Sequence, residues 1–158
     1  MKKKIVIVGH FGVGKTSLTR QFVSSIFSEK YLTTIGVNIE NKIVETTHGP
    51  LKLIIWDVAG EEELETIKTS YLKGAHGFLL VTDLTREKTY SKVNKDIAYM
   101  QNIVGDVPYL TIGNKSDLVH PDQVQKIKSN YNIDYISSAK TGENVNAFFI
   151  EIAEKLMK

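Results

Sequence analysis

Short hydrophobic runs alternate along the chain with segments whose apolar residues recur at helical spacing. Ile5 to Val8 form a continuous apolar run, which is typical of a strand buried on both faces. Leu18, Phe22, Val23 and Ile26 fall on one face of a helix predicted over residues 15–26. The remaining strands are predicted at residues 37–46, 51–57, 78–81, 108–112 and 133–136, and the remaining helices at 86–104, 121–130 and 143–157.

Strands that alternate with helices indicate an α/β fold with a mostly parallel sheet and helices on both faces. The strands at 37–46 and 51–57 flank His48-Gly49-Pro50 and are expected to form a hairpin. In an open parallel sheet, ligands bind at the carboxyl ends of the strands, so the loops after the strands are the places to look for chemistry. No repeat or linker divides the chain, and residues 1–158 are expected to form a single domain.

Composition narrows the possible classes of protein. The chain has 158 residues, of which 42% are hydrophobic and 24% charged, as in ordinary globular proteins. The absence of cysteine excludes disulfides, thiolate zinc sites, a cysteine nucleophile and lipidation on cysteine, and it fits a cytoplasmic location. The net charge of +2 is too balanced to indicate a nucleic-acid partner. No apolar run approaches the roughly 20 residues of a membrane span.

The loop after the first strand matches a phosphate-binding motif. Residues 9–16 read Gly-His-Phe-Gly-Val-Gly-Lys-Thr, which fits G-x-x-x-x-G-K-[ST] between a strand and a helix. The glycines let the backbone curl so that successive N–H groups face an anion at the helix N-terminus. Lys15 would place its charge on the β- and γ-phosphates, and the Thr16 hydroxyl can ligate Mg²⁺. The motif in this context favours a phosphate site over a chance glycine-rich turn, but it identifies neither base nor reaction.

The loop after the strand at 108–112 identifies the base. Residues 114–117 read Asn-Lys-Ser-Asp, and with the phosphate-binding loop they make the chain resemble the Ras superfamily of small GTPases, most closely its Rab-like branch. The resemblance implies that the Asp117 carboxylate accepts hydrogen bonds from the N–H groups of guanine, because an ionised carboxylate only accepts. It implies selection of GTP over ATP, since adenine cannot offer the same paired donors.

Further motifs of the family occur in order along the chain. The resemblance implies that Ser138-Ala139-Lys140 contact the base, that Phe27 lies against the guanine, and that Tyr31 closes over the phosphates. Phe27 as a plain core aromatic and Tyr31 as a loop residue remain open alternatives. The nucleotide contacts implied are Gly12, Val13, Gly14, Lys15, Thr16, Ser17, Phe27, Tyr31, Asn114, Lys115, Asp117, Ser138, Ala139 and Lys140.

Residues 56–62, Trp-Asp-Val-Ala-Gly-Glu-Glu, resemble the family segment W-D-T-A-G-Q-E. By this resemblance Thr16, Thr34 and Asp57 hold Mg²⁺, Asp57 through water. The resemblance also assigns catalysis to Lys15, Thr34, Gly60 and Glu61, with the Gly60 N–H on the γ-phosphate. It implies a six-stranded, mostly parallel sheet of the P-loop NTPase class, with the strand at 37–46 antiparallel at one edge.

Two departures from the family bear on hydrolysis. Glu61 stands where most members have a glutamine that orients the attacking water. A glutamate carboxylate about 5 Å from the γ-phosphate would add repulsion on the order of 3 kcal/mol at an effective dielectric constant near 20. Protonation of Glu61, or another residue that positions the water, would avoid this cost. Phe11 replaces a small residue and should obstruct an activating protein's arginine; the alternative is that its ring packs against switch II and leaves turnover unchanged.

Partner surfaces are implied at switch I, about 28–37, and switch II, about 58–70. Residues 61–65 read Glu-Glu-Glu-Leu-Glu where Rab proteins carry arginines. These acids either suit the first turn of a helix or meet a basic partner. We expect a monomer without a direct membrane anchor, since the sequence ends at its last helix without the lipidated tail of the family. Removal of a tail would explain the same observation.

The sequence therefore predicts a switch that binds GTP and GDP with Mg²⁺ and hydrolyses GTP slowly. An alternative is a scaffold that holds GTP constitutively because Glu61 disables turnover. An ATP-dependent kinase or motor is disfavoured by residues 114–117. The four histidines match no metal-ligand spacing and are read as structural or solvated, and Trp56 as a core residue beside the site.

Overall fold

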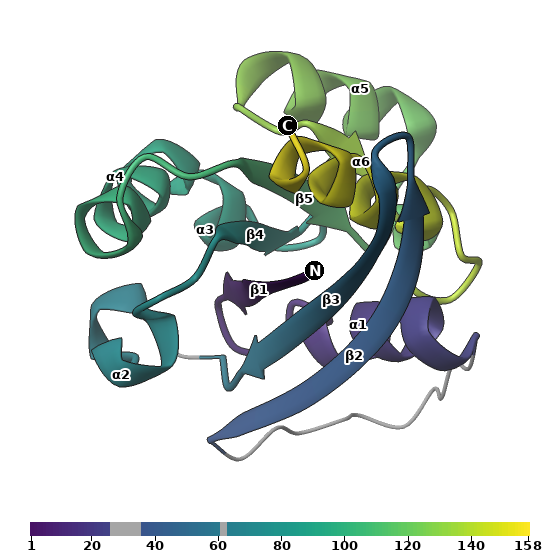
Figure 1. The fold of residues 1–158 in the computed structure, drawn as a ribbon. Coiled ribbons are helices and arrows are strands. Elements are labelled where there is room, and N and C mark those ends of the chain that lie inside the picture. The colour runs from purple at the N-terminus through teal and green to yellow at the C-terminus, as the bar shows by residue number, and fades with distance from the viewer. Residues whose placement is uncertain (26–35, 61–62) are drawn as a thin grey trace.

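The computed structural model describes residues 1–25, 36–60 and 63–158. Its strands form one sheet in the order β2-β3-β1-β4-β5-β6 (Figure 1). The strands are β1 (Lys2–Gly9), β2 (Val37–Thr46), β3 (Gly49–Val58), β4 (Gly77–Asp83), β5 (Tyr109–Asn114) and β6 (Tyr135–Ile136). Only β2 is antiparallel, and it lies at the edge beside β3. The six-stranded, mostly parallel sheet implied by the sequence is confirmed.

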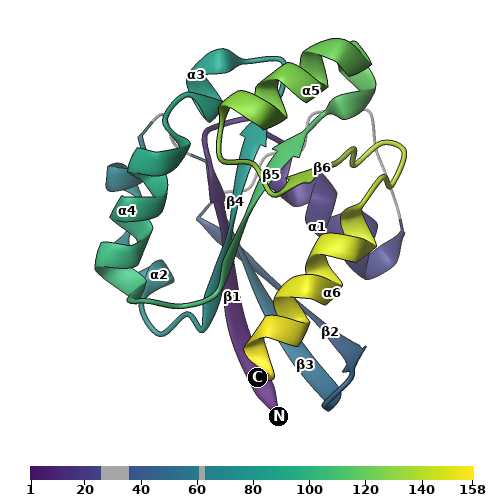
Figure 2. The same ribbon diagram turned by 90° about the horizontal axis from the view of Figure 1, so that it is seen from above.

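Helices cover both faces of the sheet (Figure 2). The α-helices are α1 (Lys15–Ser24), α2 (Thr69–Leu72), α3 (Glu87–Tyr90), α4 (Val93–Val104), α5 (Pro121–Asn130) and α6 (Val145–Leu156), with short 3₁₀ helices η1 (Leu64–Thr66) and η2 (Ser116–Leu118). The single helix expected over 86–104 is two helices, α3 and α4, separated at Ser91 and Lys92. No helix in the described part of the chain is long and apolar enough to cross a membrane.

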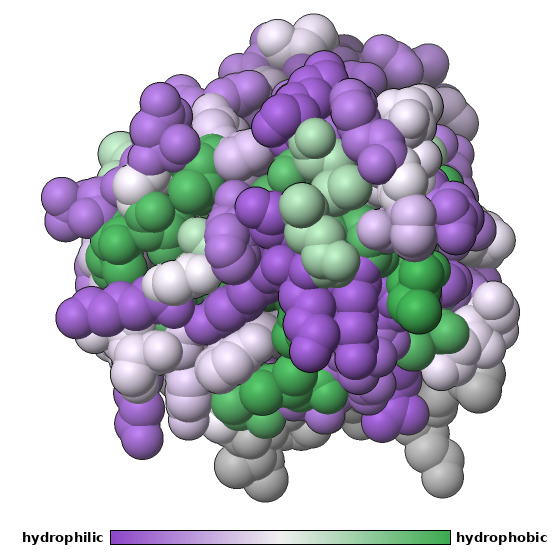
Figure 3. All heavy atoms as spheres, in the orientation of Figure 1, coloured by the Kyte–Doolittle hydropathy of each residue, from purple (hydrophilic) through white to green (hydrophobic). Residues whose placement is uncertain are grey.

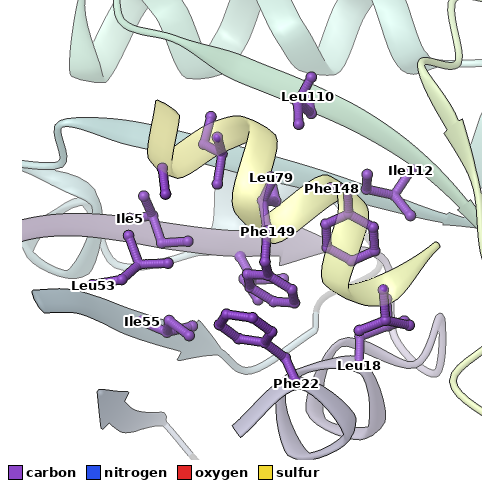
Figure 4. Close-up of a cluster of buried hydrophobic side chains, with 14 of the residues drawn as sticks. Ile5, Leu18, Phe22, Leu53, Ile55, Leu79, Leu110, Ile112, Phe148 and Phe149 are labelled. Carbon is purple, nitrogen blue, oxygen red and sulfur yellow. The ribbon is translucent and has the colours of Figure 1, made fainter. Parts of the chain in front are cut away.

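The alternation of side chains along each strand creates two hydrophobic clusters, one on each face. Ile5 and Ile7 of β1 point into the cluster beneath α1 and α6, whereas Val6 and Val8 point into the cluster beneath α2, α4 and α5. In the first cluster Phe22 of α1 stacks on Phe149 of α6, with ring centroids 4.1 Å apart (Figure 4). Both faces of β1 are therefore buried, as its unbroken apolar run predicts.

The two ends of the parallel strands form opposite sides of the molecule, one with the chain termini and one with the candidate site. The chain termini lie together at the edge where β1 begins, which faces the viewer in Figure 1. Figure 3 shows this side covered by hydrophilic residues with smaller hydrophobic areas between them. The carboxyl ends of the parallel strands lie at the opposite edge (Figure 2), where the candidate site is built.

Candidate nucleotide-binding site

The glycine-rich loop between β1 and α1 has backbone angles that suit glycine. Gly12 has φ +76° and Gly14, which caps α1, has φ +101°, both in the left-handed region. A Cβ on Gly14 would lie 2.3 Å from Nδ2 of Asn114, so a larger residue would displace the asparagine. The loop thus leads directly into the amino end of α1, the kind of helix terminus at which anions bind.

Asn114, at the end of β5, joins two loops through one buried side chain. Its Nδ2 donates to the Val13 carbonyl at 3.0 Å, and its Oδ1 accepts from the Ser137 hydroxyl at 3.2 Å and the Ala139 N–H at 3.3 Å. The residue is 1% exposed. Asn114 therefore fixes the phosphate-binding loop relative to the loop after β6.

Lys115 braces the same loop by a second route. Its Nζ donates to the Gly12 carbonyl at 2.8 Å and lies 2.8 Å from Oδ2 of Asp83. Asp83 is fully buried at the end of β4 and also accepts from the Thr85 hydroxyl at 2.6 Å. The sequence analysis missed Asp83. Its position as the first acid after a buried strand was the available signal, because that edge of the sheet collects the chemistry.

Asp117 and Ser138 bring the two base loops into contact. The Ser138 hydroxyl donates to Oδ1 of Asp117 at 2.7 Å, and Ser138 is fully buried whereas Asp117 is exposed. Gln21 of α1 donates to the Ala139 carbonyl at 2.7 Å and ties this region to the first helix. The arrangement holds one oxygen of an exposed carboxylate, at the place where the resemblance requires a guanine acceptor.

A cavity of about 670 Å³ adjoins this region on the side of α5. Its lining includes Asp117, Lys128, Tyr135 and Glu143, but no residue of the phosphate-binding loop. The cavity therefore borders the base side and is separate from the phosphate cradle.

Thr16 and Asp57 form the candidate Mg²⁺ position. The Thr16 hydroxyl donates to Oδ2 of Asp57 at 2.6 Å, and Asp57 is fully buried at the end of β3. Hydroxyl and carboxylate oxygens are hard donors of the kind Mg²⁺ prefers, so this pair fits the ion. Among the described residues no group of three His, Asp or Glu side chains could hold a metal. An ion here would therefore complete its shell with water and phosphate oxygens.

Gly60 packs against the phosphate-binding loop with no room for a side chain. A Cβ there would lie 2.8 Å from Lys15 Nζ, 2.8 Å from Phe11 Cα and 2.9 Å from the His10 carbonyl oxygen. Lys15 is buried, at 6% exposed, and its ammonium reaches this junction. The Phe11 side chain is 49% exposed and stands at the rim. Lys15 and Gly60, which the resemblance places on the γ-phosphate, are neighbours here.

The structure brings most of the predicted site residues to one edge of the sheet. Those described lie in the loop at 9–14, in the first turn of α1 at 15–17, at Asp57 and Gly60, and in the segments 114–117 and 138–140. Phe27, Tyr31, Thr34 and Glu61 lie outside the described residues.

The two described acids of switch II, Glu63 and Glu65, lie at a short 3₁₀ helix and not at the start of α2. Glu63 precedes the three-residue η1, and α2 starts only at Thr69. The Glu63 carboxylate instead lies 3.1 Å from Nζ of Lys92, and that hydrogen bond holds the pKa of Glu63 below its ordinary value. Glu63 thus stands at the start of η1, with Glu65 in its first turn, and the described partner of Glu63 is a lysine of the same chain.

Histidines and Trp56 behave largely as the sequence suggested. His10 is buried, while His120 caps α5 by accepting from the Asp122 N–H at 3.2 Å. Trp56 is partly buried, and Nζ of Lys4 lies 3.7 Å from the centre of its ring. None of these contacts joins Trp56 to the phosphate-binding loop.

Comparison with known proteins agrees with this geometry. The model of the Ras family matches residues 4–158. The chain is 37% identical to Ras-related protein Rab-1 of Theileria annulata over 97% of the chain and 73% of the relative. It is 36% identical to Ras-related protein SEC4 of Saccharomyces cerevisiae over 98% and 75%, and 34% identical to human Ras-related protein Rab-8B over 98% and 78%.

Proposed function

Because the chain belongs to the Ras family, of the Rab-like kind, we propose that it is a guanine-nucleotide switch that hydrolyses GTP slowly. Members of this family bind GTP and are GTPases, so family membership supports a GTP-binding switch. Residues 1–158 would form one GTPase domain. The finer proposal concerns which residues bind, which hold the ion and why turnover is slow.

The observation that carries the proposal is the joint support of the phosphate cradle and the base loops by Asn114. One buried amide bonds both the Val13 carbonyl and the Ala139 N–H, so the two halves of a nucleotide site are held at a fixed separation. Asp117 then selects guanine, since a carboxylate accepts from paired donors that adenine lacks. The exposed position of Asp117 and its contact with Ser138 support this role.

Phosphate binding would rest on the backbone of residues 12–16 and on Lys15. The N–H groups at the start of α1 face the phosphates, and the Lys15 ammonium balances charge on the β- and γ-phosphates. Thr16 and Asp57, with Thr34, would hold Mg²⁺, which neutralises charge on the phosphate oxygens. The Gly60 N–H would bind the γ-phosphate. Loss of the γ-phosphate on hydrolysis would then release switch I at Thr34 and switch II at Gly60. Effector proteins would bind switch I and switch II in the GTP-bound state and not after their release. The protein would act as a cytoplasmic monomer.

Hydrolysis transfers the γ-phosphoryl group to water and breaks its bond to the bridging oxygen. Glu61 can accept a hydrogen bond from the water but, when ionised, cannot donate one to phosphate. Its repulsion is on the order of 3 kcal/mol, and only the part felt more strongly in the transition state slows the step, so roughly 100-fold is the upper bound. Phe11 at the rim would in addition hinder an arginine supplied by an activating protein.

Single-turnover GTP hydrolysis tests the slow step. The double variant Glu61→Gln/Phe11→Gly should exceed the wild type by up to roughly 100-fold without an activator, with Glu61→Gln giving most of the gain. Phe11→Gly alone should matter mainly when an activating protein is present. If the wild type already turns over as fast as the double variant, the slow-hydrolysis proposal fails.

The constitutively GTP-bound scaffold is the second candidate, favoured by the same glutamate at position 61. Chromatography of the nucleotide that co-purifies with the protein separates the two functions. Mostly GDP supports a working hydrolase, and mostly GTP supports the scaffold. Preferential binding of ATP would contradict both.

A further inference from the structure

A buried acid–base pair links the phosphate-binding loop to α4. Nε2 of His10 lies 3.3 Å from Oδ2 of Asp96, and the two residues are 5% and 2% exposed. A buried carboxylate is costly unless it is hydrogen-bonded or paired. Neither side chain belongs to the nucleotide contacts described above. The contact between His10 and Asp96 is therefore costly to bury. Its effect on the site depends on the residues that pack against His10.

His10 and Phe11 form the wall on which Gly60 rests. A Cβ on Gly60 would lie 2.9 Å from the His10 carbonyl oxygen and 2.8 Å from Phe11 Cα, so backbone meets backbone there. Nη1 of Arg86 donates to the Phe11 carbonyl at 2.7 Å. The wall is thus held from two sides, by Asp96 through the His10 ring and by Arg86 through the Phe11 carbonyl.

The amino end of α4, with Lys92 as its N-cap, also holds the segment that follows Gly60. Nζ of Lys92 donates to Oε1 of Glu63 at 3.1 Å, and Nζ of Lys95 lies 4.0 Å from Oε1 of Glu65. Lys92, Lys95 and Asp96 have the spacing i, i+3, i+4, which places them on one side of the helical chain segment. One side of this segment therefore contacts both the wall, at His10, and the residues that follow Gly60, at Glu63 and Glu65.

We propose that Asp96, through His10, and Lys92, through Glu63, are positioning residues that hold Gly60 at the γ-phosphate side of the site. This inference rests on the proposed function, because it requires that Gly60 meet the γ-phosphate. A contact that holds Gly60 in this position increases the affinity only for a ligand that binds Gly60 there. The pairs therefore favour GTP over GDP, and Glu63 and Glu65 neutralise lysines of this chain.

The test is the ratio of the dissociation constants for GTP and GDP. Asp96→Asn keeps the size of the side chain and removes its charge, and it should raise Kd(GTP)/Kd(GDP) about fivefold, the lower end of typical coupling between sites. Lys92→Gln, at a more exposed pair, should raise the ratio about twofold. Fluorescent analogues of both nucleotides in excess Mg²⁺ report the two constants, and urea unfolding checks that each variant is folded.

Matched controls lie on α5. Asp122→Asn changes an exposed acid whose Oδ2 is 3.8 Å from His120 Nδ1, and Lys126→Gln changes an exposed lysine. Both should leave the ratio unchanged. Equal weakening of GTP and GDP in Asp96→Asn and Lys92→Gln would mean a purely structural role and overturn the inference, as would an unchanged ratio. Should Asp96→Asn fail to fold, Lys92→Gln decides. A wild type that binds neither nucleotide would instead overturn the proposed function.

Discussion

Asn114→Ala is the sharpest test of how the site is assembled. The substitution removes an amide that donates to the Val13 carbonyl and accepts from the Ser137 hydroxyl and the Ala139 N–H. These three partners lie in two loops, which the proposed function assigns to the phosphate and base ends of the nucleotide. We therefore expect the loss to reduce both the free energy of unfolding and nucleotide affinity.

The magnitude follows from the number of bonds and their burial. Each hydrogen bond contributes about 0.5–1.5 kcal/mol, and a buried partner left unsatisfied costs about 1–3 kcal/mol. Three bonds to a residue that is 1% exposed give a loss of about 2–4 kcal/mol in the free energy of unfolding without nucleotide. If one bond's worth, about 1.4 kcal/mol, is transmitted to the site, GDP affinity falls about tenfold.

Urea unfolding followed by the fluorescence of Trp56, the single tryptophan, measures the first quantity. Recording it without GDP and with excess GDP separates intrinsic stability from the ligand's contribution. Asn102→Ala, at an exposed asparagine of α4, is the matched control and should change stability by less than about 0.5 kcal/mol. A loss below about 1 kcal/mol in Asn114→Ala, or an equal loss in the control, would refute the reasoning.

Three further predictions test the packing of the core, the dependence of stability on pH, and the packing of Gly60 against the wall of His10 and Phe11. Phe149→Ala removes a fully buried ring and should lower the free energy of unfolding by about 3–5 kcal/mol in urea titrations; a loss under 1 kcal/mol would contradict the packing. Hydrogen bonds from the Thr47 hydroxyl and N–H lower the pKa of Glu154 from an ordinary value of 4.5, so this carboxylate stabilises the fold above that pH and the contribution disappears as pH falls through the lowered pKa. Glu154→Gln should therefore lower the urea midpoint at pH 7, and the gap to the wild type should shrink as the pH falls below 4.5; a gap that does not change with pH would contradict this. Gly60→Ala should weaken GTP binding more than GDP binding in the same fluorescence assay, because a Cβ would lie 2.8 Å from loop backbone, and equal affinities would argue against that crowding.

Local periodicity predicted most elements but not their ends. The strand at 37–46 and the helix at 121–130 were placed at their observed bounds, because a turn or a proline marks where each begins or ends. The helix over 86–104 was wrong as one piece, since Ser91 and Lys92 separate α3 from α4. Periodicity continues across such a break when both pieces pack on the same cluster, so the sequence did not reveal it.

The sequence also located the site through contiguous motifs. A phosphate-binding loop depends on glycines, a lysine and a threonine at fixed spacing, so residues 9–16 can be read without neighbours. Asp83 and Arg86 could not be read this way. Asp83 pairs with Lys115 and Arg86 donates to the Phe11 carbonyl, and no short-range spacing encodes such partners.

By itself the sequence determined the class of the fold, the edge of the sheet where chemistry lies and the motifs that imply a guanine nucleotide. Only the tertiary structure decided which distant side chains meet: Thr16 with Asp57, His10 with Asp96, and Asn114 with Val13, separated by 41, 86 and 101 residues. Hydrophobic patterning specifies which face of an element is buried, but strand order and helix packing choose its neighbours. The contact between α4 and the phosphate-binding loop exists because β4 lies beside β1, and that adjacency is a property of the folded sheet.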